Sequence, residues 1–116
     1  MKVICTRIEL KPGSLPAVRA WAREVTTRKG EVLETLRAEG VTVESVFLDR
    51  LGDTDYLVYY MRARDLEHAF AVGPKLKLPI QEYHNQFKRE TWELVSQLEC
   101  LADFTCPEDP GAGSSG

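Results

Sequence analysis

Residues 56–61, Tyr56-Leu57-Val58-Tyr59-Tyr60-Met61, are the stretch that decides the fold. They are aromatic, β-branched or otherwise apolar, which is the composition typical of a β-strand. Because the side chains of a strand point alternately to its two sides, both faces of this strand are apolar. Such a strand is usually central in its sheet and covered on both sides. The stretch therefore predicts a sheet with a buried middle.

Three further segments show the alternation of a strand. Residues 41–50 precede the central stretch and are joined to it by the turn residues 51–55, as in a hairpin. In this strand, Val41 and Val43 are predicted to share one face, and Glu44 lies on the other. Residues 3–10 form the first predicted strand, with these side chains on one face: Ile4, Thr6, Ile8 and Leu10. The last predicted strand, 98–104, has these on one side: Leu98, Cys100, Ala102 and Phe104.

A long helix is predicted between the first two strands, over residues 14–39, from apolar residues three or four positions apart. Ser14 is its expected N-cap, and Gly40 is a favourable residue just after its end. A helix of that length is unusual in so small a domain, which leaves open a kink or break near Gly30. Trp21 lies on the apolar stripe and is predicted to belong to the core.

Two more helices are predicted after the central strand. Asp65 is the expected cap of a short one, and Pro79 is expected to open the other. The inward stripe of the last helix consists of Ile80, Tyr83, His84, Phe87 and Thr91. A solvated, charged face is predicted for Lys88, Arg89, Glu90 and Glu93.

This order of elements predicts an α+β fold of the ferredoxin-like kind, β-α-β-β-α-β, with an antiparallel sheet and helices on one face. The second face of the sheet would then be a large exposed apolar surface, because residues 56–61 are apolar on both sides. Monomers rarely tolerate such a surface. A second copy that packs sheet against sheet would cover it, so we predict a two-fold homodimer.

Length and composition limit the class of protein. The 116 residues fit a single domain, predicted over residues 1–106, with a disordered tail at 107–116 that is rich in Gly, Pro and Ser. The net charge of −3 argues against a nucleic-acid-binding protein. No apolar run is long enough to predict a membrane span. Three widely spaced cysteines and a start unlike a signal peptide predict a reduced, cytoplasmic protein.

Four stretches carry a family resemblance: residues 10–13, 43–48 and 55–61, and Tyr83-His84 with the following 87–92. With them the chain resembles a small bacterial family of unknown function within the dimeric α/β-barrel superfamily, in which two ferredoxin-like subunits close a barrel. The resemblance extends to about Phe104 and implies the fold and the dimer. It implies no particular reaction, because the superfamily includes cofactor-free monooxygenases, lactone isomerases, polyketide cyclases, haem enzymes and ligand-binding domains.

His84 is the strongest candidate for chemistry. It lies on or beside the inward stripe of its helix, where an imidazole can face a pocket between helix and sheet and act as acid/base near neutral pH. The structural alternative is a boundary histidine hydrogen-bonded to the backbone or to a carboxylate. His68 is predicted to point outward, and no metal-ligand spacing joins the two histidines. We therefore predict no metal and no cofactor, with haem ligation by His84 as an unsupported alternative.

Four residues are predicted to bind ligand: Tyr59, Tyr60, Tyr83 and Arg7. Phenols in an apolar pocket can orient an aromatic substrate, although packing in the core or a dimer interface is the commoner role. Arg7 can bind an acidic ligand, or form an interfacial ion pair with a carboxylate. The carboxylates considered as its partner are those of Glu9, Glu44, Glu99 and Asp103.

Three functions are compatible with these features. The first is the binding of a small hydrophobic or aromatic molecule in a pocket between the sheet and the helices. The second is a cofactor-independent monooxygenase, cyclase or isomerase that uses His84 as acid/base. The third is a non-catalytic dimeric assembly module. The feature that separates them is whether His84 and a tyrosine meet at one cavity of sufficient volume.

Overall fold

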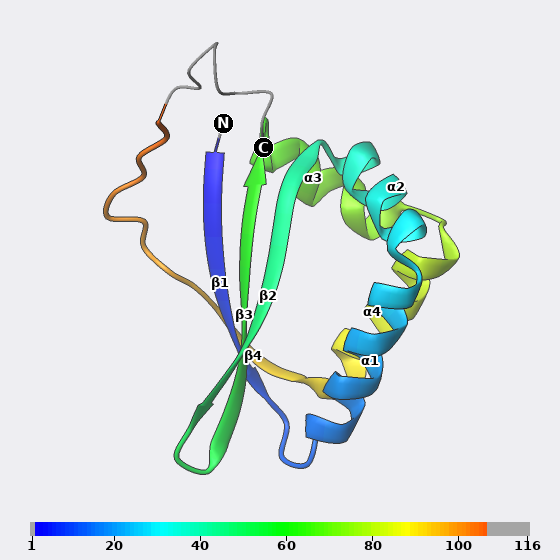
Figure 1. Ribbon diagram of the computed structural model, residues 1–116, viewed down its shortest axis with the longest axis vertical. Helices are drawn as coiled ribbons and strands as arrows, with labels where there is room; N and C mark the ends of the chain where they lie inside the picture. Colours follow the sequence, from blue (N-terminus) through cyan, green and yellow to red (C-terminus); the bar gives the residue numbers. More distant parts are fainter. Residues whose placement is uncertain (1, 107–116) are drawn as a thin grey trace.

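The computed structural model describes residues 2–106, which form an α+β fold with the sheet on one side and the helices on the other (Figure 1). In chain order the elements are β1 (Lys2–Leu10), α1 (Leu15–Thr27), α2 (Lys29–Glu39), β2 (Val41–Leu51), β3 (Thr54–Ala63), α3 (Leu66–Val72), the 3₁₀ helix η1 (Gly73–Lys75), α4 (Pro79–Thr91) and β4 (Trp92–Gln97).

Neighbouring strands of the sheet are all antiparallel, in the order β2-β3-β1-β4. The stretch 56–61 lies in β3, which has a neighbour on each side, as predicted. Ile8 of β1 stands opposite Leu57 of β3, and these two side chains are 0% and 2% exposed. The middle of the sheet therefore belongs to the core.

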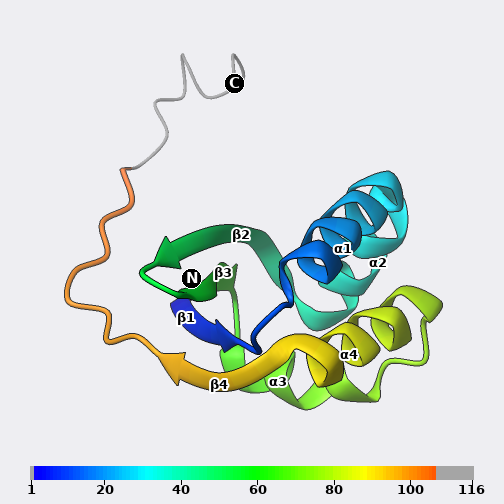
Figure 2. The same ribbon diagram turned by 90° about the horizontal axis from the view of Figure 1, so that it is seen from below.

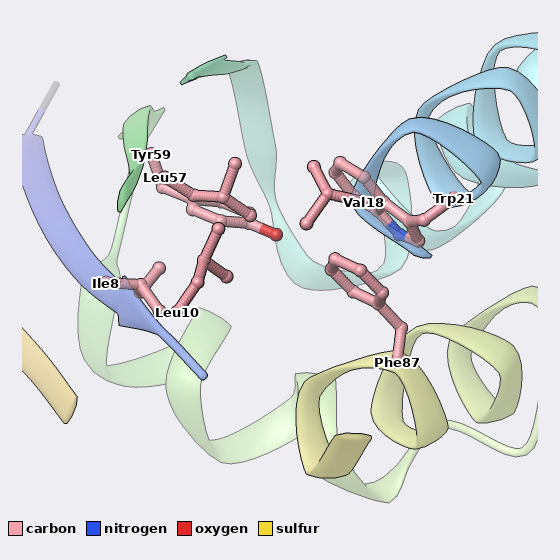
Figure 3. Close-up of a cluster of buried hydrophobic side chains, with 7 residues drawn as sticks. All are labelled: Ile8, Leu10, Val18, Trp21, Leu57, Tyr59 and Phe87. Carbon is pink, nitrogen blue, oxygen red and sulfur yellow. The ribbon is translucent and has the colours of Figure 1, made fainter. Parts of the chain in front are cut away.

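The helices cover one face of the sheet only (Figure 2). Trp21 of α1 and Phe87 of α4 point toward the sheet, and their rings stack with centroids 4.6 Å apart (Figure 3). The prediction that Trp21 belongs to the core is confirmed, because its side chain is buried. The remaining buried members of this core cluster are Ile8, Leu10, Val18, Leu57 and Tyr59.

Local signals place most helix ends where the sequence predicts them. Gly40 follows α2 with a left-handed φ of 74°, a conformation that favours glycine. The side chain of Asp65 caps α3 by accepting a hydrogen bond from the backbone N–H of His68, and Pro79 opens α4. Ser14 is an exception: its backbone is already helical, with φ −80° and ψ −13°, and its hydroxyl makes no capping hydrogen bond.

The segment 14–39 contains two helices rather than one. α1 ends one residue before Arg28 and α2 begins one residue after it, because Arg28 leaves the helical conformation, with φ −98° and ψ 37°. The guanidinium of Arg28 spans the break through ion pairs with Glu24 on one side and Glu31 on the other. Gly30 lies within the first turn of α2, so the break precedes it.

Replacing the cap residue, Asp65→Ala, is expected to lower the free energy of unfolding by about 1 kcal/mol. The reason is that the backbone N–H of His68 loses its hydrogen-bond partner at the start of α3. Urea denaturation at pH 7 measures the effect. Glu34→Ala, on the exposed surface of α2, is the control and should change stability by less than about 0.5 kcal/mol. Equal losses in the two variants would contradict a capping role.

The last strand begins earlier in the chain than predicted. β4 starts immediately after α4, whereas residues 98–104 form no strand, so that prediction is wrong. The backbone N–H of Lys11 donates to the carbonyl of Thr91, the final residue of α4. This contact brings the chain beside the end of β1, where Trp92 pairs with Leu10. The helix therefore delivers the chain directly into the sheet, and no loop separates them.

The sheet face that points away from the helices, here called the uncovered face, is covered by no helix of the described part of the chain (Figure 2). Its exposed apolar side chains are Val43, Phe47, Leu51 and Leu94. The segment after β4 lies on this side, orange in Figures 1 and 2. It is attached there by an ion pair between Asp103 Oδ1 and Arg62 Nη2, at 2.7 Å.

Two further sequence predictions concern the C-terminal tail and membrane-spanning segments. The predicted tail at 107–116 lies outside the described residues. Within residues 2–106, no helix is both long enough and apolar enough to cross a membrane.

Candidate functional site

A cavity of about 500 Å³ lies between the sheet and the helices. Every described helix and strand contributes to its walls, which are mostly apolar. Two wall residues, Phe70 of α3 and Val95 of β4, are 51% and 52% exposed, so the cavity is open to solvent at these side chains. Pockets for small molecules have volumes of roughly 300–1,000 Å³. The cavity is therefore large enough for a small ligand.

His84 lines this cavity from α4. Its Nδ1 accepts a hydrogen bond from the indole N–H of Trp21, at 3.2 Å. With this ring orientation the neutral imidazole carries its proton on Nε2. Burial, and then the nearby ammonium of Lys88, lower the pKa of His84 to about 4. As placed, His84 can donate a hydrogen bond from Nε2 at neutral pH, but its one lone pair is already engaged by Trp21.

Three rings surround one part of the cavity: those of Tyr59, His84 and Trp92. The centroids of Tyr59 and Trp92 are 5.4 Å apart, and His84 lies 6.3 Å from each. Tyr59 is only 8% exposed, and its hydroxyl points from β3 toward α1 and α4 (Figure 3). Among the described residues neither this hydroxyl nor the indole N–H of Trp92 has a hydrogen-bond partner. Buried polar groups are normally paired, so both point to a missing partner.

Three charged side chains line the same cavity: Glu39 at the end of α2, Glu44 on β2 and Lys88 on α4. Burial, and then the charge of Glu44, raise the pKa of Glu39 to about 7. Burial also raises the pKa of Glu44 and lowers that of Lys88. Glu44 lies on the edge strand β2, where the residue keeps contact with solvent.

A β-bulge brings Glu44 to the cavity side of the sheet. Val41 of β2 pairs with Ala63 of β3, and Val43 pairs with the adjacent Arg62, so β2 contains one extra residue here. The alternation of side chains shifts at this point. Val41 and Glu44 consequently share the face toward the helices, while Val43 lies on the other face. The prediction that Val41 and Val43 share a face is therefore wrong.

The structure separates the predicted ligand-binding tyrosines. Tyr59 lines the cavity, but Tyr60 lies on the opposite face of β3, where Arg62 Nε donates a hydrogen bond to its hydroxyl. Tyr83 packs against the core cluster, with the guanidinium of Arg28 5.8 Å from its ring. Of the four predicted ligand-binding residues, only Tyr59 is brought together with His84 at the cavity.

Arg7 also lies away from the cavity, on the uncovered face of the sheet. Its Nη2 is 3.4 Å from Asp49 Oδ2, and its guanidinium lies 3.8 Å from the centre of the Tyr56 ring. The partner is thus a residue that the sequence analysis did not consider. One carboxylate that it did consider, that of Asp103, pairs with Arg62 instead.

Sequence reasoning missed the charged part of the site. Lys88 was predicted on a solvated face, but its side chain is half-buried and its ammonium lies 5.0 Å from the centre of the Trp92 ring. The available signal is spacing, because Lys88 follows His84 by four residues and lies on the same side of α4. His68 is exposed, as predicted. In residues 2–106 no group of three His, Cys, Asp or Glu side chains is arranged to hold a metal ion.

Fold and site together define a small α+β protein whose sheet and helices enclose a cavity with aromatic and charged walls. Residues 1–109 match a family of unknown function, DUF6176, and the chain belongs to that family.

Two solved structures are similar in fold. One is protein Atu4242 from Agrobacterium tumefaciens, which is 17% identical with a TM-score of 0.57, over 84% of this chain and 89% of that chain. The other is PA3566 from Pseudomonas aeruginosa, 17% identical with a TM-score of 0.52, over 86% and 93% of the two chains. At this identity the similarity concerns the fold alone. None of the curated proteins is significantly similar to the chain.

Proposed function

We propose that the protein binds a small aromatic or otherwise hydrophobic molecule in the cavity between the sheet and the helices. The observation that carries this proposal is the hydroxyl of Tyr59, which is buried at the cavity wall without a hydrogen-bond partner among the described residues. Leaving such a group unpaired costs about 1–3 kcal/mol, and a bound ligand would offset that cost. The mostly apolar walls suit a hydrophobic body.

One polar group of the ligand is an oxygen that accepts hydrogen bonds. The groups around it are the Tyr59 hydroxyl, the Trp92 indole N–H and Nε2 of His84, and each of them can donate. A carbonyl or ether oxygen is an acceptor for all three. The rings of Tyr59 and Trp92 belong to the wall, and aromatic side chains of a pocket can pack against an aromatic guest.

The indole signals of the protein provide a direct test. The chain has two tryptophans, Trp21 and Trp92, and both line the cavity. Addition of 2-acetylnaphthalene, an aromatic ketone, is expected to shift the indole ¹H–¹⁵N signal of Trp92 downfield, because its N–H gains an acceptor. Tyr59→Phe should weaken binding about 3- to 10-fold in the same titration, through the loss of one hydrogen bond.

Two variants control this experiment. Tyr60→Phe removes a phenol from the same strand on the opposite face and should leave the affinity unchanged. Val32→Phe adds volume to the cavity wall and should abolish binding. If the ketone shifts neither indole signal at millimolar concentration, or if it binds Val32→Phe equally well, the proposed site is wrong.

We also propose that two copies pack through the uncovered face of the sheet, as in the dimeric α/β barrels, each subunit having the ferredoxin-like arrangement. The strand order β2-β3-β1-β4 supports this arrangement. The exposed apolar side chains on that face support the contact, and Phe47 at 58% is among the largest of them. Two arginines of the face, Arg7 and Arg62, are already paired within the chain, so these two charges would keep a partner in the contact.

The alternative function, a monooxygenase, cyclase or isomerase with His84 as acid/base, has less support from the geometry. The position of His84 at the cavity favours it. The hydrogen bond from Trp21 and the lowered pKa oppose a role as base at neutral pH. A donor role toward a substrate oxygen is compatible with both observations, and it is the same contact that ligand binding requires.

A further inference from the structure

We propose that the molecule bound in this cavity carries a basic nitrogen, and that its ammonium group binds between the carboxylates of Glu39 and Glu44. This inference rests on the proposed function and names the class of its ligand: a small arylalkylamine rather than a neutral or acidic aromatic compound.

The charges that line the cavity do not balance. The carboxylates of Glu39 and Glu44 are accompanied by the single ammonium of Lys88. Within the described residues, neither carboxylate makes a hydrogen bond or a close ion pair. The ammonium of Lys88 lies against the ring of Trp92 and acts on both carboxylates only at longer range. Like charges in a partly buried space repel each other, and an added cation relieves the repulsion. A negatively charged ligand would increase it.

The wall beside Glu39 leaves room for its carboxylate. A Cβ atom on Gly73, the first residue of η1, would collide with Oε2 of Glu39. The backbone of Gly73 is ordinary helix, with φ −48° and ψ −55°, so its conformation does not require glycine. The absent side chain therefore provides space for the carboxylate head.

The carboxylates and the aromatic rings belong to the same cavity, within reach of one small molecule. In the register of the sheet, Glu44 stands opposite Met61 and Val46 stands opposite Tyr59. Glu44 and Tyr59 are thus diagonal neighbours on the cavity side, roughly 7–8 Å apart by the usual geometry of antiparallel pairs. Because both side chains line the cavity from these positions, a nitrogen one or two carbons away from an aromatic ring can contact Glu44 while the ring lies beside Tyr59.

Three naphthalene compounds that differ only in one substituent test the inference: 2-naphthalenemethylamine, 2-naphthalenemethanol and 2-naphthoate. Isothermal titration calorimetry at pH 7.5 and low salt measures their dissociation constants with the full chain. The amine is expected to bind about tenfold more tightly than the alcohol, because it adds a charge-assisted contact, and the carboxylate is expected to bind more weakly than either.

Two variants locate the contact. The double variant Glu39→Gln with Glu44→Gln should reduce the preference for the amine over the alcohol to less than about twofold, while the affinity for the alcohol stays the same. Gly73→Ala keeps both charges but displaces the carboxylate of Glu39, and it should lower the same preference in part. Unchanged binding of the alcohol shows in each case that the cavity is still folded.

The outcomes separate this inference from the proposed function. If the alcohol binds and the amine binds no more tightly, the cation site is wrong and the hydrophobic cavity site stands. A preference for the amine that survives in the double variant also overturns the cation site, because the amine then binds elsewhere. If none of the three compounds binds, the proposed function fails, and this inference fails with it.

Discussion

Sedimentation equilibrium at micromolar concentration is expected to give a mass of twice the 13.1 kDa of one chain. The reason is the uncovered face of the sheet, on which Val43, Phe47 and Leu51 of β2 are 41%, 58% and 62% exposed. Exposed apolar side chains gathered on one face of a sheet are uncommon in monomers. A second copy is the occupant that this face fits, because a two-fold axis lets each copy cover the apolar face of the other.

A charge placed on that face should separate the two copies. Phe47→Lys is expected to weaken the dimer at least about 100-fold, since an unpaired ammonium in a buried contact costs roughly 3–5 kcal/mol. Leu33→Lys is the matched control: it makes the same type of change at a partly exposed apolar residue of α2, on the helix side, and should leave the dimer intact. A wild-type protein that sediments as a monomer at these concentrations would contradict the prediction.

Replacing Glu39→Gln is expected to stabilise the protein at pH 8 but not at pH 5. The pKa of Glu39 is raised from 4.5 to about 7, chiefly by burial. The folded state therefore holds this proton more strongly than the unfolded state does. Its contribution to stability is complete below pH 4.5 and is lost as the pH rises to about 7. The side chain of glutamine does not ionise, so the variant does not lose this stability as the pH rises.

The expected size of this effect follows from the two pKa values. Their difference corresponds to about 3 kcal/mol, which water in the open cavity reduces to about 1–2 kcal/mol. Urea denaturation of both proteins at pH 5 and pH 8, at equal protein concentration, should show the variant gaining that amount relative to wild type between the two pH values. Glu34→Gln, an exposed residue of α2, should show no such gain. A pH-independent difference for Glu39→Gln would falsify the assignment.

The elements that the sequence predicts correctly are those set by local chemistry. The alternation of Ile4, Ile8 and Leu10 places one face of β1 in the core because no irregularity interrupts that face before the end of the strand. Gly40 and Asp65 end and begin helices through their own backbone and side chain. These signals need no information about distant parts of the chain.

The last strand depends on distant contacts, and the sequence could not place it. Residues 92–97 and residues 98–104 are both apolar enough to form a strand, and local pattern favours the second segment. Residues 92–97 lie beside β1 through long-range contacts, among them the backbone hydrogen bond from Lys11 to Thr91, which joins residues eighty positions apart. Apolar side chains in the second segment remain exposed: Leu101 is 87% and Phe104 is 90% accessible.

The candidate site was predictable only in its aromatic part. His84 and Tyr59 lie on apolar stripes that the sequence shows directly, and the structure places both at the cavity. The carboxylates of Glu39 and Glu44 carry no such signal, because charged residues at the ends and edges of elements are normally solvated. For the same reason the charged pattern predicts that Lys88 is solvated. Its spacing of four residues from His84 indicates instead that it lies on the cavity side of α4.

The bulge in β2 has a consequence for the comparison of relatives. Whether the carboxylate of Glu44 faces the cavity depends on the number of residues in β2 as well as on the type of residue at this position. Deletion of Thr42 would restore regular alternation and keep Val41 and Glu44 on the same side, because residues two positions apart in a strand share a face. A relative with a one-residue gap at this position would therefore keep its aligned glutamate in the cavity. A relative of equal length whose strand is regular would instead turn either that glutamate or the residue aligned with Val41 to the opposite side.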